Sequence, residues 1–122
     1  MTRAFKQRFP AGWRATSLGD ELPLAYGKGL PAKSRDATGT FPVYGSAGVA
    51  GHHSESLVDG PALIVGRKGN VGMAHLVAGP SWPIDTTYFA TFRSDQAPKF
   101  FKYLLDYLDL RSLDKSTAIP SL

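Results

Sequence analysis

The chain has 122 residues, a mass of 13.1 kDa, no cysteine and a formal net charge of +4. This length favours one domain, and 43% hydrophobic with 20% charged residues argues against disorder. The lack of cysteine excludes a disulfide framework, a thiolate metal site and a cysteine nucleophile. No apolar run approaches the roughly 18 residues of a membrane span, and no signal peptide is evident, so we expect a cytoplasmic protein.

Basic residues gather in the first part of the chain. Residues 1–70 hold nine Lys or Arg and five Asp or Glu, whereas residues 71–122 hold five of each. A basic half beside a neutral half favours a polyanionic partner such as nucleic acid. Four of the nine bases lie near the N-terminus, however, and a charge of +4 is common, so charge alone leaves the partner open.

Little regular structure is predicted before residue 41. Residues 13–18 alternate enough for a short strand, or for an anchor in which Trp13 packs on the core. A turn at residues 19–21 and a short apolar piece follow. Residues 27–40 are mostly Gly, Lys, Pro, Ser, Asp and Thr, which is typical of a loop.

Residues 41–93 are predicted to form β-structure. Residues 41–44 indicate a short strand, in which Pro42 favours an edge position or a strand start, followed by a glycine-rich loop. The apolar run 62–65 predicts a strand buried on both faces, and residues 71–77 predict its hairpin partner. Residues 84–92 are rich in Thr, Tyr and Phe and predict a third strand.

A helix is predicted over residues 95–113. Phe101, Leu104, Leu105 and Leu108 recur at the i, i+3, i+4 and i+7 spacing of one apolar helix face. Ser94 or Asp95 is the expected cap, and Pro98 falls in the first turn, where its missing N–H costs nothing. The predicted fold is therefore α+β, a small twisted mixed or antiparallel sheet with glycine-rich loops and a C-terminal helix packed on it.

Motifs for catalysis are not evident. The glycine-rich stretch 66–72 has the wrong spacing for a nucleotide-binding fingerprint and joins two predicted strands, whereas those motifs need a following helix. His52 and His53 are adjacent, so in a strand they would face opposite sides and make a poor metal pair. A small hydrolase using His52 or His53 with Asp85 remains an alternative, but no Gly-x-Ser-x-Gly motif supports it.

Three glycine-punctuated loops are the candidate binding elements, at residues 28–35, 44–54 and 67–70. Glycine lets a backbone approach a surface closely, while Arg and Lys can contact phosphates or guanine, and Asn, Ser and Thr can contact adenine or the DNA backbone. Each loop alone could equally be a solvated turn. Three of them in one small chain favour nucleic-acid binding.

Five segments in order resemble the target recognition domain of the type I restriction–modification specificity (S) subunit. They cover most of residues 10–122 and are residues 10–20 (PAGWRATSLGD), 39–52 (GTFPVYGSAGVAGH), 62–72 (ALIVGRKGNVG), 79–89 (GPSWPIDTTYF), and the helix at 100–108 with the sequence STAIPSL at 116–122.

The resemblance implies a domain that reads one half of a split target in the major groove of double-stranded DNA. It would catalyse nothing and hold no cofactor or metal, but would direct a methyltransferase subunit, which uses S-adenosylmethionine, and a restriction subunit. We expect a flexible arm at residues 1–9 and a single, truncated recognition domain at 10–122, without the spacer helix or second domain of a complete subunit. A homodimer is conceivable.

Family resemblance does not assign base contacts, so the expected DNA-binding residues come from the three loops. They are Lys28, Lys33 and Arg35 for phosphates, and Tyr44, Ser46, His52, Arg67, Lys68 and Asn70 near base edges or the backbone. Arg67 could instead hold the hairpin. A second function class is an interaction fragment that binds the methyltransferase subunit and has little DNA affinity of its own.

Overall fold

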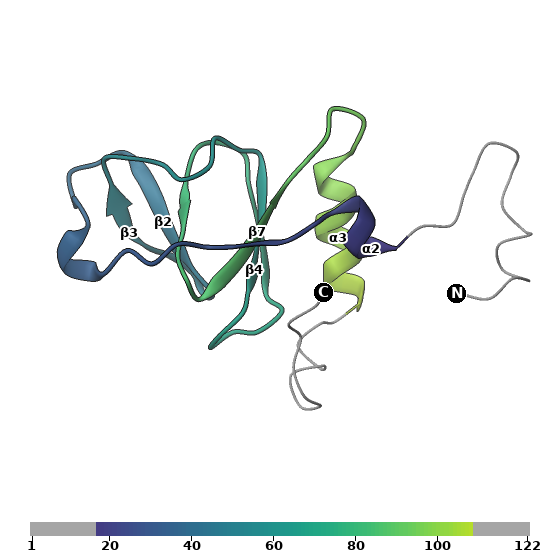
Figure 1. Cartoon of the computed structure of the whole chain (residues 1–122), viewed down its shortest axis with the longest axis horizontal. Helices are drawn as coiled ribbons and strands as arrows, with labels where there is room; N and C mark the ends of the chain where they lie inside the picture. The colour runs from purple at the N-terminus through teal and green to yellow at the C-terminus, as the bar shows by residue number, and fades with distance from the viewer. Residues whose placement is uncertain (1–16, 109–122) are drawn as a thin grey trace, which may run out of the picture.

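Two small β-sheets and a helix that packs on one of them make up the structure (Figure 1). It is a computed structural model, and it describes residues 17–108. In chain order the elements are α2 (Leu18–Glu21), β1 (Ala25–Tyr26), the 3-10 turn η1 (Ala32–Ser34), β2 (Phe41–Gly45), β3 (Gly48–His53), β4 (Ala62–Gly66), β5 (Ala74–Val77), β6 (Trp82–Pro83), β7 (Thr87–Thr91) and α3 (Pro98–Leu108).

The larger sheet is antiparallel throughout, with the strand order β1-β7-β4-β5. The smaller sheet has the order β3-β2-β6, in which β3 runs antiparallel and β6 parallel to β2. The predicted α+β class is confirmed, but the strands form two sheets where one was expected. Residues 84–86 connect β6 of the small sheet to β7 of the large one.

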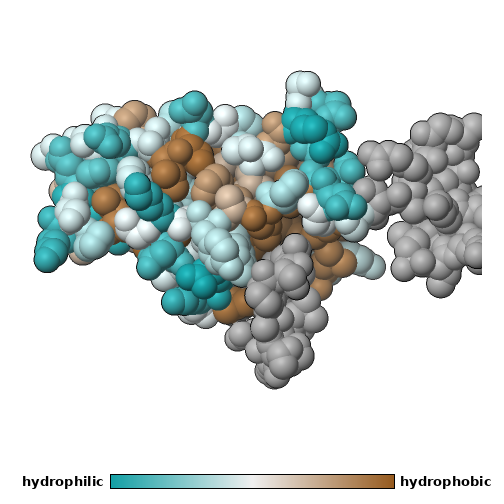
Figure 2. Space-filling model, in the orientation of Figure 1, coloured by the Kyte–Doolittle hydropathy of each residue, from teal (hydrophilic) through white to brown (hydrophobic). Residues whose placement is uncertain are grey.

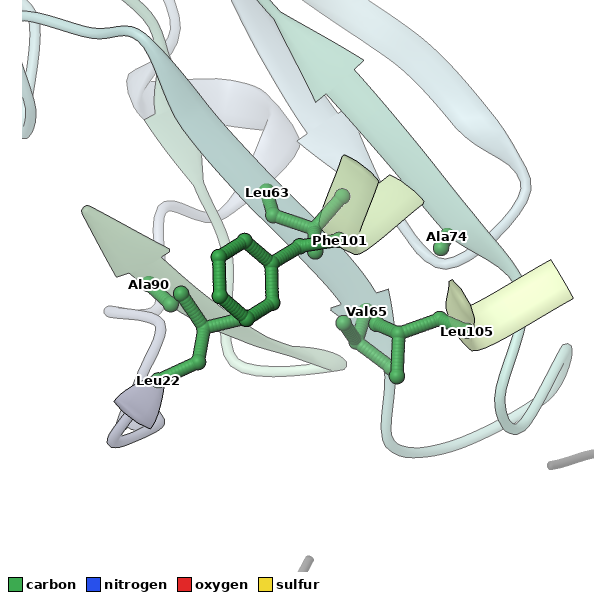
Figure 3. Packing of buried hydrophobic residues seen from close by; sticks show 7 residues of the cluster. All are labelled: Leu22, Leu63, Val65, Ala74, Ala90, Phe101 and Leu105. Carbon is green, nitrogen blue, oxygen red and sulfur yellow. The ribbon is translucent and has the colours of Figure 1, made fainter. Parts of the chain in front are cut away.

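The main hydrophobic core lies between α3 and one face of the large sheet (Figure 3). Leu63 and Val65 alternate along β4 toward this face, and Phe101 and Leu105 of α3 pack over them. Ile64 is also fully buried, outside this cluster. The prediction that the apolar run 62–65 is buried on both faces of its strand is thereby confirmed.

Helix α3 begins at Pro98, the first-turn position predicted for it. The expected cap at Ser94 or Asp95 is wrong, because both residues lie in a turn that precedes the helix. The N–H of Gln96 closes this turn by donating to the carbonyl of Arg93 (3.0 Å). The predicted extension over residues 109–113 lies outside the described residues, as do the arm at residues 1–9 and the Trp13 anchor.

Two segments predicted to be irregular are regular in the structure. Gly48 has a φ of +122°, which allows a tight turn after Gly45, and residues 48–53 then pair with β2 as strand β3. Residues 19–21, predicted as a turn, belong to α2. Ser17 caps this helix by accepting a hydrogen bond from the N–H of Asp20 (3.1 Å).

The strand predicted at residues 41–44 is present as β2, whereas the strands predicted at 71–77 and 84–92 are shorter than expected. Strand β5 starts only at Ala74, because Gly72 has a φ of +80° and donates its N–H back to the carbonyl of Gly66 (2.9 Å). Strand β7 starts at Thr87, after a turn in which the Thr87 N–H bonds to the carbonyl of Ile84 (3.0 Å).

Among the described helices, none is long and apolar enough to cross a membrane.

Candidate nucleic-acid interface

The three glycine-rich loops meet around the β2–β3 hairpin. Arg35 in the first loop donates from Nη1 to the carbonyl of Ala50 on β3 (3.3 Å). In the third loop, the N–H of Asn70 donates to Oγ of Ser46 in the hairpin turn (3.2 Å). The first and third loops are thus bonded to the β2–β3 hairpin, which is itself formed by the second loop. We call the surface made by residues 28–35, 44–53 and 66–70 the joined-loop surface.

Ser46 is the buried connection between the hairpin turn and the 66–70 loop. Only 9% of it is exposed, and its carbonyl lies 3.2 Å from Nε2 of His75. Gly69 has a φ of +80°, and a Cβ there would lie 3.0 Å from the Ser46 hydroxyl. A Cβ on Gly66 would lie 2.0 Å from the carbonyl oxygen of Asn70. These glycines therefore permit a close backbone approach, and the hydroxyl expected near base edges has an internal partner.

Arg67 fastens the tip of the β4–β5 hairpin to the turn before β7. Its Nε and Nη2 both donate to the carbonyl of Asp85 (3.1 and 2.8 Å). The guanidinium also lies 5.1 Å from the ring centroid of Tyr26, within the range of a cation–π contact. Arg67 therefore holds the hairpin, which is one of the two roles expected for it. The other role, a contact with DNA, stays a prediction.

The first loop is anchored at both ends. The indole N–H of Trp82 donates to the carbonyl of Lys28 (2.9 Å) at one end. At the other, the N–H of Asp36 donates to Nδ1 of His53 (3.1 Å), whose ring packs edge-on against Trp82. Trp82 and His53 therefore fix the path of the loop that carries Lys28, Lys33 and Arg35.

Arg35 has internal partners like those of Arg67. Besides its bond to Ala50, its Nε donates to the carbonyl of Leu30 within the loop (2.9 Å). Its Cδ lies 3.4 Å from where a Cβ of Gly51 would be, so the side chain packs on the bare backbone of β3. Arg35 therefore links the first loop to strand β3. Its expected contact with a phosphate stays a prediction.

The remaining predicted residues keep polar groups available at the surface. The described structure shows no hydrogen bond or ion pair from the side chains of Lys28, Lys33, Lys68, His52 or Asn70, although the Asn70 backbone is held. Tyr44 is half-buried, with its ring 6.0 Å from that of His75. Lysine ammonium groups can contact phosphates, and amides and imidazoles can bond to base edges.

Sequence reasoning missed three residues at or beside this surface. Tyr26 is 65% exposed and lies beneath the Arg67 guanidinium, and Val49 is 56% exposed on β3. His75 bonds the carbonyl of Ser46 from β5. Tyr26 reaches this position because β1 pairs with β7 across more than sixty residues, so no local pattern could have identified it.

Neither a metal-binding group nor the His–Asp85 pair of the alternative hydrolase is assembled within residues 17–108. No group of three His, Cys, Asp or Glu residues that could hold a metal occurs within residues 17–108. His53 is engaged by Trp82 and the Asp36 N–H, and within the described chain neither His52 nor His53 bonds to Asp85.

The end of the first loop is shaped by Asp36 and Thr38. Hydrogen bonds from the hydroxyl and the backbone N–H of Thr38 to the Asp36 carboxyl lower the pKa of that carboxyl.

Comparison with known proteins identifies the fold through solved structures. No protein-family model matches the chain, and no curated protein sequence does either. The S subunit of a type I restriction–modification system from M. genitalium superposes with a TM-score of 0.76 at 22% identity, over 84% of this chain and 29% of that one.

Two further structures are similar. The HsdS subunit from Thermoanaerobacter tengcongensis matches with a TM-score of 0.70 at 17% identity, over 91% of this chain and 31% of that one. A structure addressing complex assembly and conformational transition of the type I R-M system matches with a TM-score of 0.65 at 17% identity, over 94% and 34%. The chain has the fold predicted from its sequence resemblance and spans about a third of the length of these proteins.

Proposed function

We propose that this chain is a DNA-recognition domain of a type I restriction–modification specificity subunit, binding double-stranded DNA in a sequence-specific way. One observation carries the proposal. Two glycine-rich loops are bonded to a third, the β2–β3 hairpin, on a fold shared with solved S subunits. A rigid scaffold that presents close-packed loops suits groove recognition, because base discrimination needs side chains held in register.

The nine predicted residues fall into groups according to whether their side chains are exposed or already bonded within the protein. Lys28, Lys33 and Lys68 are exposed and contact phosphates, which positions the duplex without reading its sequence. Asn70, His52 and Tyr44 offer an amide, an imidazole and a phenol to base edges. Ser46, Arg35 and Arg67 contribute mainly by fixing the loops, since each already bonds within the protein.

In this role the chain performs no chemistry of its own. It acts in the cytoplasm and directs a methyltransferase subunit and a restriction subunit to the target, and residues 10–122 form a recognition domain. The methyltransferase subunit, using S-adenosylmethionine, would modify the DNA. Binding that depends on Lys–phosphate contacts releases counterions, so affinity should fall steeply as salt rises.

The test is duplex binding by the full chain, measured by fluorescence anisotropy across a salt series. A pool of random duplexes, selected over several rounds, should yield a preferred sequence that binds about a thousandfold more tightly than unselected DNA. Failure to bind any duplex at low salt, alone or with the methyltransferase subunit present, would contradict the proposal.

A second candidate is a module that binds the methyltransferase subunit with little DNA affinity. It is favoured by the outer flank of α3, where Phe100, Tyr103 and Tyr107 are 59%, 68% and 85% exposed. Exposed aromatic clusters mark protein contacts, because Tyr and Phe are enriched at interfaces. Light scattering on a mixture with the methyltransferase subunit distinguishes the two: a complex lost in Y103A/Y107A, with no duplex binding, supports the second.

A further inference from the structure

Val49 is an exposed apolar side chain in a polar part of the molecule. Most of the described large hydrophobic residues that are exposed belong to α3, whereas Val49 lies on β3 and is 56% exposed. Hydrophilic side chains make up most of the visible surface at the end of the molecule that carries β2 and β3 (Figure 2). A single exposed valine is common on protein surfaces, so its meaning depends on how the strand holds it.

A β-bulge determines which face of the sheet carries Val49. In the pairing of β2 with β3, Val43 lies opposite Gly51 and Tyr44 lies opposite Val49, which leaves Ala50 without a partner. Regular alternation would place Val49 on the same face as Gly51, and this is also the face of the fully buried Val43. The extra residue moves Val49 to the face of Tyr44 instead. The bulge therefore turns an apolar side chain away from the buried face of the sheet.

Contacts from the first loop hold this bulge in place. Nη1 of Arg35 donates to the carbonyl of Ala50, the bulged residue (3.3 Å). A Cβ on Gly51 would lie 3.4 Å from Cδ of Arg35, so the glycine beside the bulge leaves room for the arginine side chain. Bulges are frequent beside functional sites, where they redirect a side chain. The outward orientation of Val49 is thus a built feature of the joined-loop surface.

The β2–β3 hairpin is suited to a DNA groove. Strand β3 is at the edge of the small sheet, and the hairpin lies at the end of the molecule away from α3 (Figure 1). The major groove of B-DNA, about 12 Å wide, admits a two-stranded β-ribbon. His52 lies opposite Pro42, two residues from Tyr44, so it shares the face of Val49 and can bond to a base edge. This face therefore combines a polar group with an apolar one.

Thymine is the one standard base that presents a methyl group in the major groove, where the other recognition groups of the bases are polar donors and acceptors. An apolar side chain held toward the groove therefore gains most from contact with thymine. Resting on the proposed function, we infer that Val49 contacts the 5-methyl group of a thymine and thereby specifies an A·T pair at one position of the target. Because valine has no polar side-chain group, this contact adds discrimination without a phosphate contact.

The test removes the methyl group from the DNA. In the preferred duplex obtained by selection, each thymine is replaced in turn by uracil, which lacks the 5-methyl group but pairs with adenine in the same way. Anisotropy with the full wild-type chain should show, at one position, an affinity about fourfold to tenfold weaker, because burial of about one methyl group and its contacts is lost. This series needs no variant, so its result does not depend on how a variant folds.

The same change is then made from the protein side. Val49→Ala should bind the thymine duplex about fourfold to tenfold more weakly than wild type. At the sensitive position it should distinguish thymine from uracil by less than about twofold, because the partner of the methyl group is already absent. Its salt slope should equal that of wild type. A lower slope would assign the effect of Val49 to displaced phosphate contacts and overturn the inference.

Leu108→Ala is the matched control, because Leu108 is 45% exposed but lies on α3, at the other end of the molecule. It should bind the thymine and uracil duplexes as wild type does. Circular dichroism and thermal unfolding confirm that both variants keep the fold, as expected for exposed positions. Equal losses of affinity in the two variants would overturn the inference, since they would reflect a general effect of removing surface hydrophobic groups.

Failure of the inference is separable from failure of the proposed function. A wild-type chain that binds no duplex, or binds all duplexes alike, overturns both. A wild-type chain that selects a preferred sequence but tolerates uracil at every thymine overturns only the inference, and so does a preferred sequence that contains no A·T pair. A uracil effect that persists unchanged in Val49→Ala also overturns it, because another residue would then contact the methyl group.

Discussion

The α3 end and the joined-loop end of this protein are held together by different forces. At α3, Phe101 and Leu105 bury apolar surface against β4, and the free energy comes from the hydrophobic effect. At the other end, Ser46, Arg35 and Arg67 bond to backbone groups, and glycines let those groups approach. The α3 end is therefore stabilised mainly by the burial of apolar side chains. The joined-loop end is stabilised by individual hydrogen bonds that fix the conformation of its loops.

The comparison explains how the joined-loop surface could vary while the fold is kept. A polar contact of this kind contributes about 1 kcal/mol, so the loss of one changes a loop without unfolding the core. A buried aromatic side chain contributes several times more. The four substitutions below test this difference, from the largest expected effect to the smallest.

Phe101→Ala should lower the free energy of unfolding by about 3–5 kcal/mol, because it leaves a cavity between α3 and β4. Phe100→Ala, on the same helix but 59% exposed, is the matched control and should cost less than about 1 kcal/mol. Chemical denaturation measures both. Similar losses in the two variants would contradict the assignment of the core to one face of α3.

Gly66→Ala should destabilise the protein by about 1–3 kcal/mol and weaken duplex binding, because the new methyl would meet the carbonyl of Asn70. Gly79→Ala is the control, since nothing lies within 4 Å of the added Cβ. Thermal unfolding and anisotropy report the two effects. A Gly66→Ala protein with unchanged DNA affinity would separate this loop from the interface.

Arg67→Ala should cost about 1 kcal/mol of stability through its lost bonds to the Asp85 carbonyl, reduced by partial exposure. Its neighbour Lys68→Gln should leave stability unchanged but lower the salt slope of DNA binding by about 0.9. The pair thus distinguishes a residue that holds the loop from one that contacts DNA. The reverse pattern, a stable Arg67→Ala protein with a lower slope, would reassign Arg67 to phosphate binding.

Thr38→Val should have the smallest effect, and one that depends on pH. The hydroxyl bond from Thr38, which valine lacks, lowers the pKa of Asp36 below its ordinary value of 3.8, as does the backbone N–H bond, which valine keeps; the hydroxyl's contribution to stability is present above that pH. It is lost as the pH falls through the lowered pKa. Melting temperatures of wild type and variant should differ slightly at pH 7 and converge at strongly acid pH; a constant difference would point to lost packing.

The predictable parts of the fold are those with a local apolar pattern. The run 62–65 and the spacing of Phe101 and Leu105 predicted a buried strand and a packed helix, and both are present. Strand β3 was missed, because its sequence of Gly, Ala, Val and His has weak strand propensity and it forms by pairing with β2. The two-residue strand β6 was missed because its partners are distant in sequence.

For the candidate site, the sequence by itself identified three loops by their glycines and bases, since turn chemistry is local. It also located the net charge, because charges can be counted without a structure. Only the tertiary structure decided which bases are engaged: Arg35 and Arg67 bond to Ala50 and Asp85, while Lys28, Lys33 and Lys68 face outward. Those bonds join residues 15 and 18 positions apart, and such contacts depend on how the strands pair.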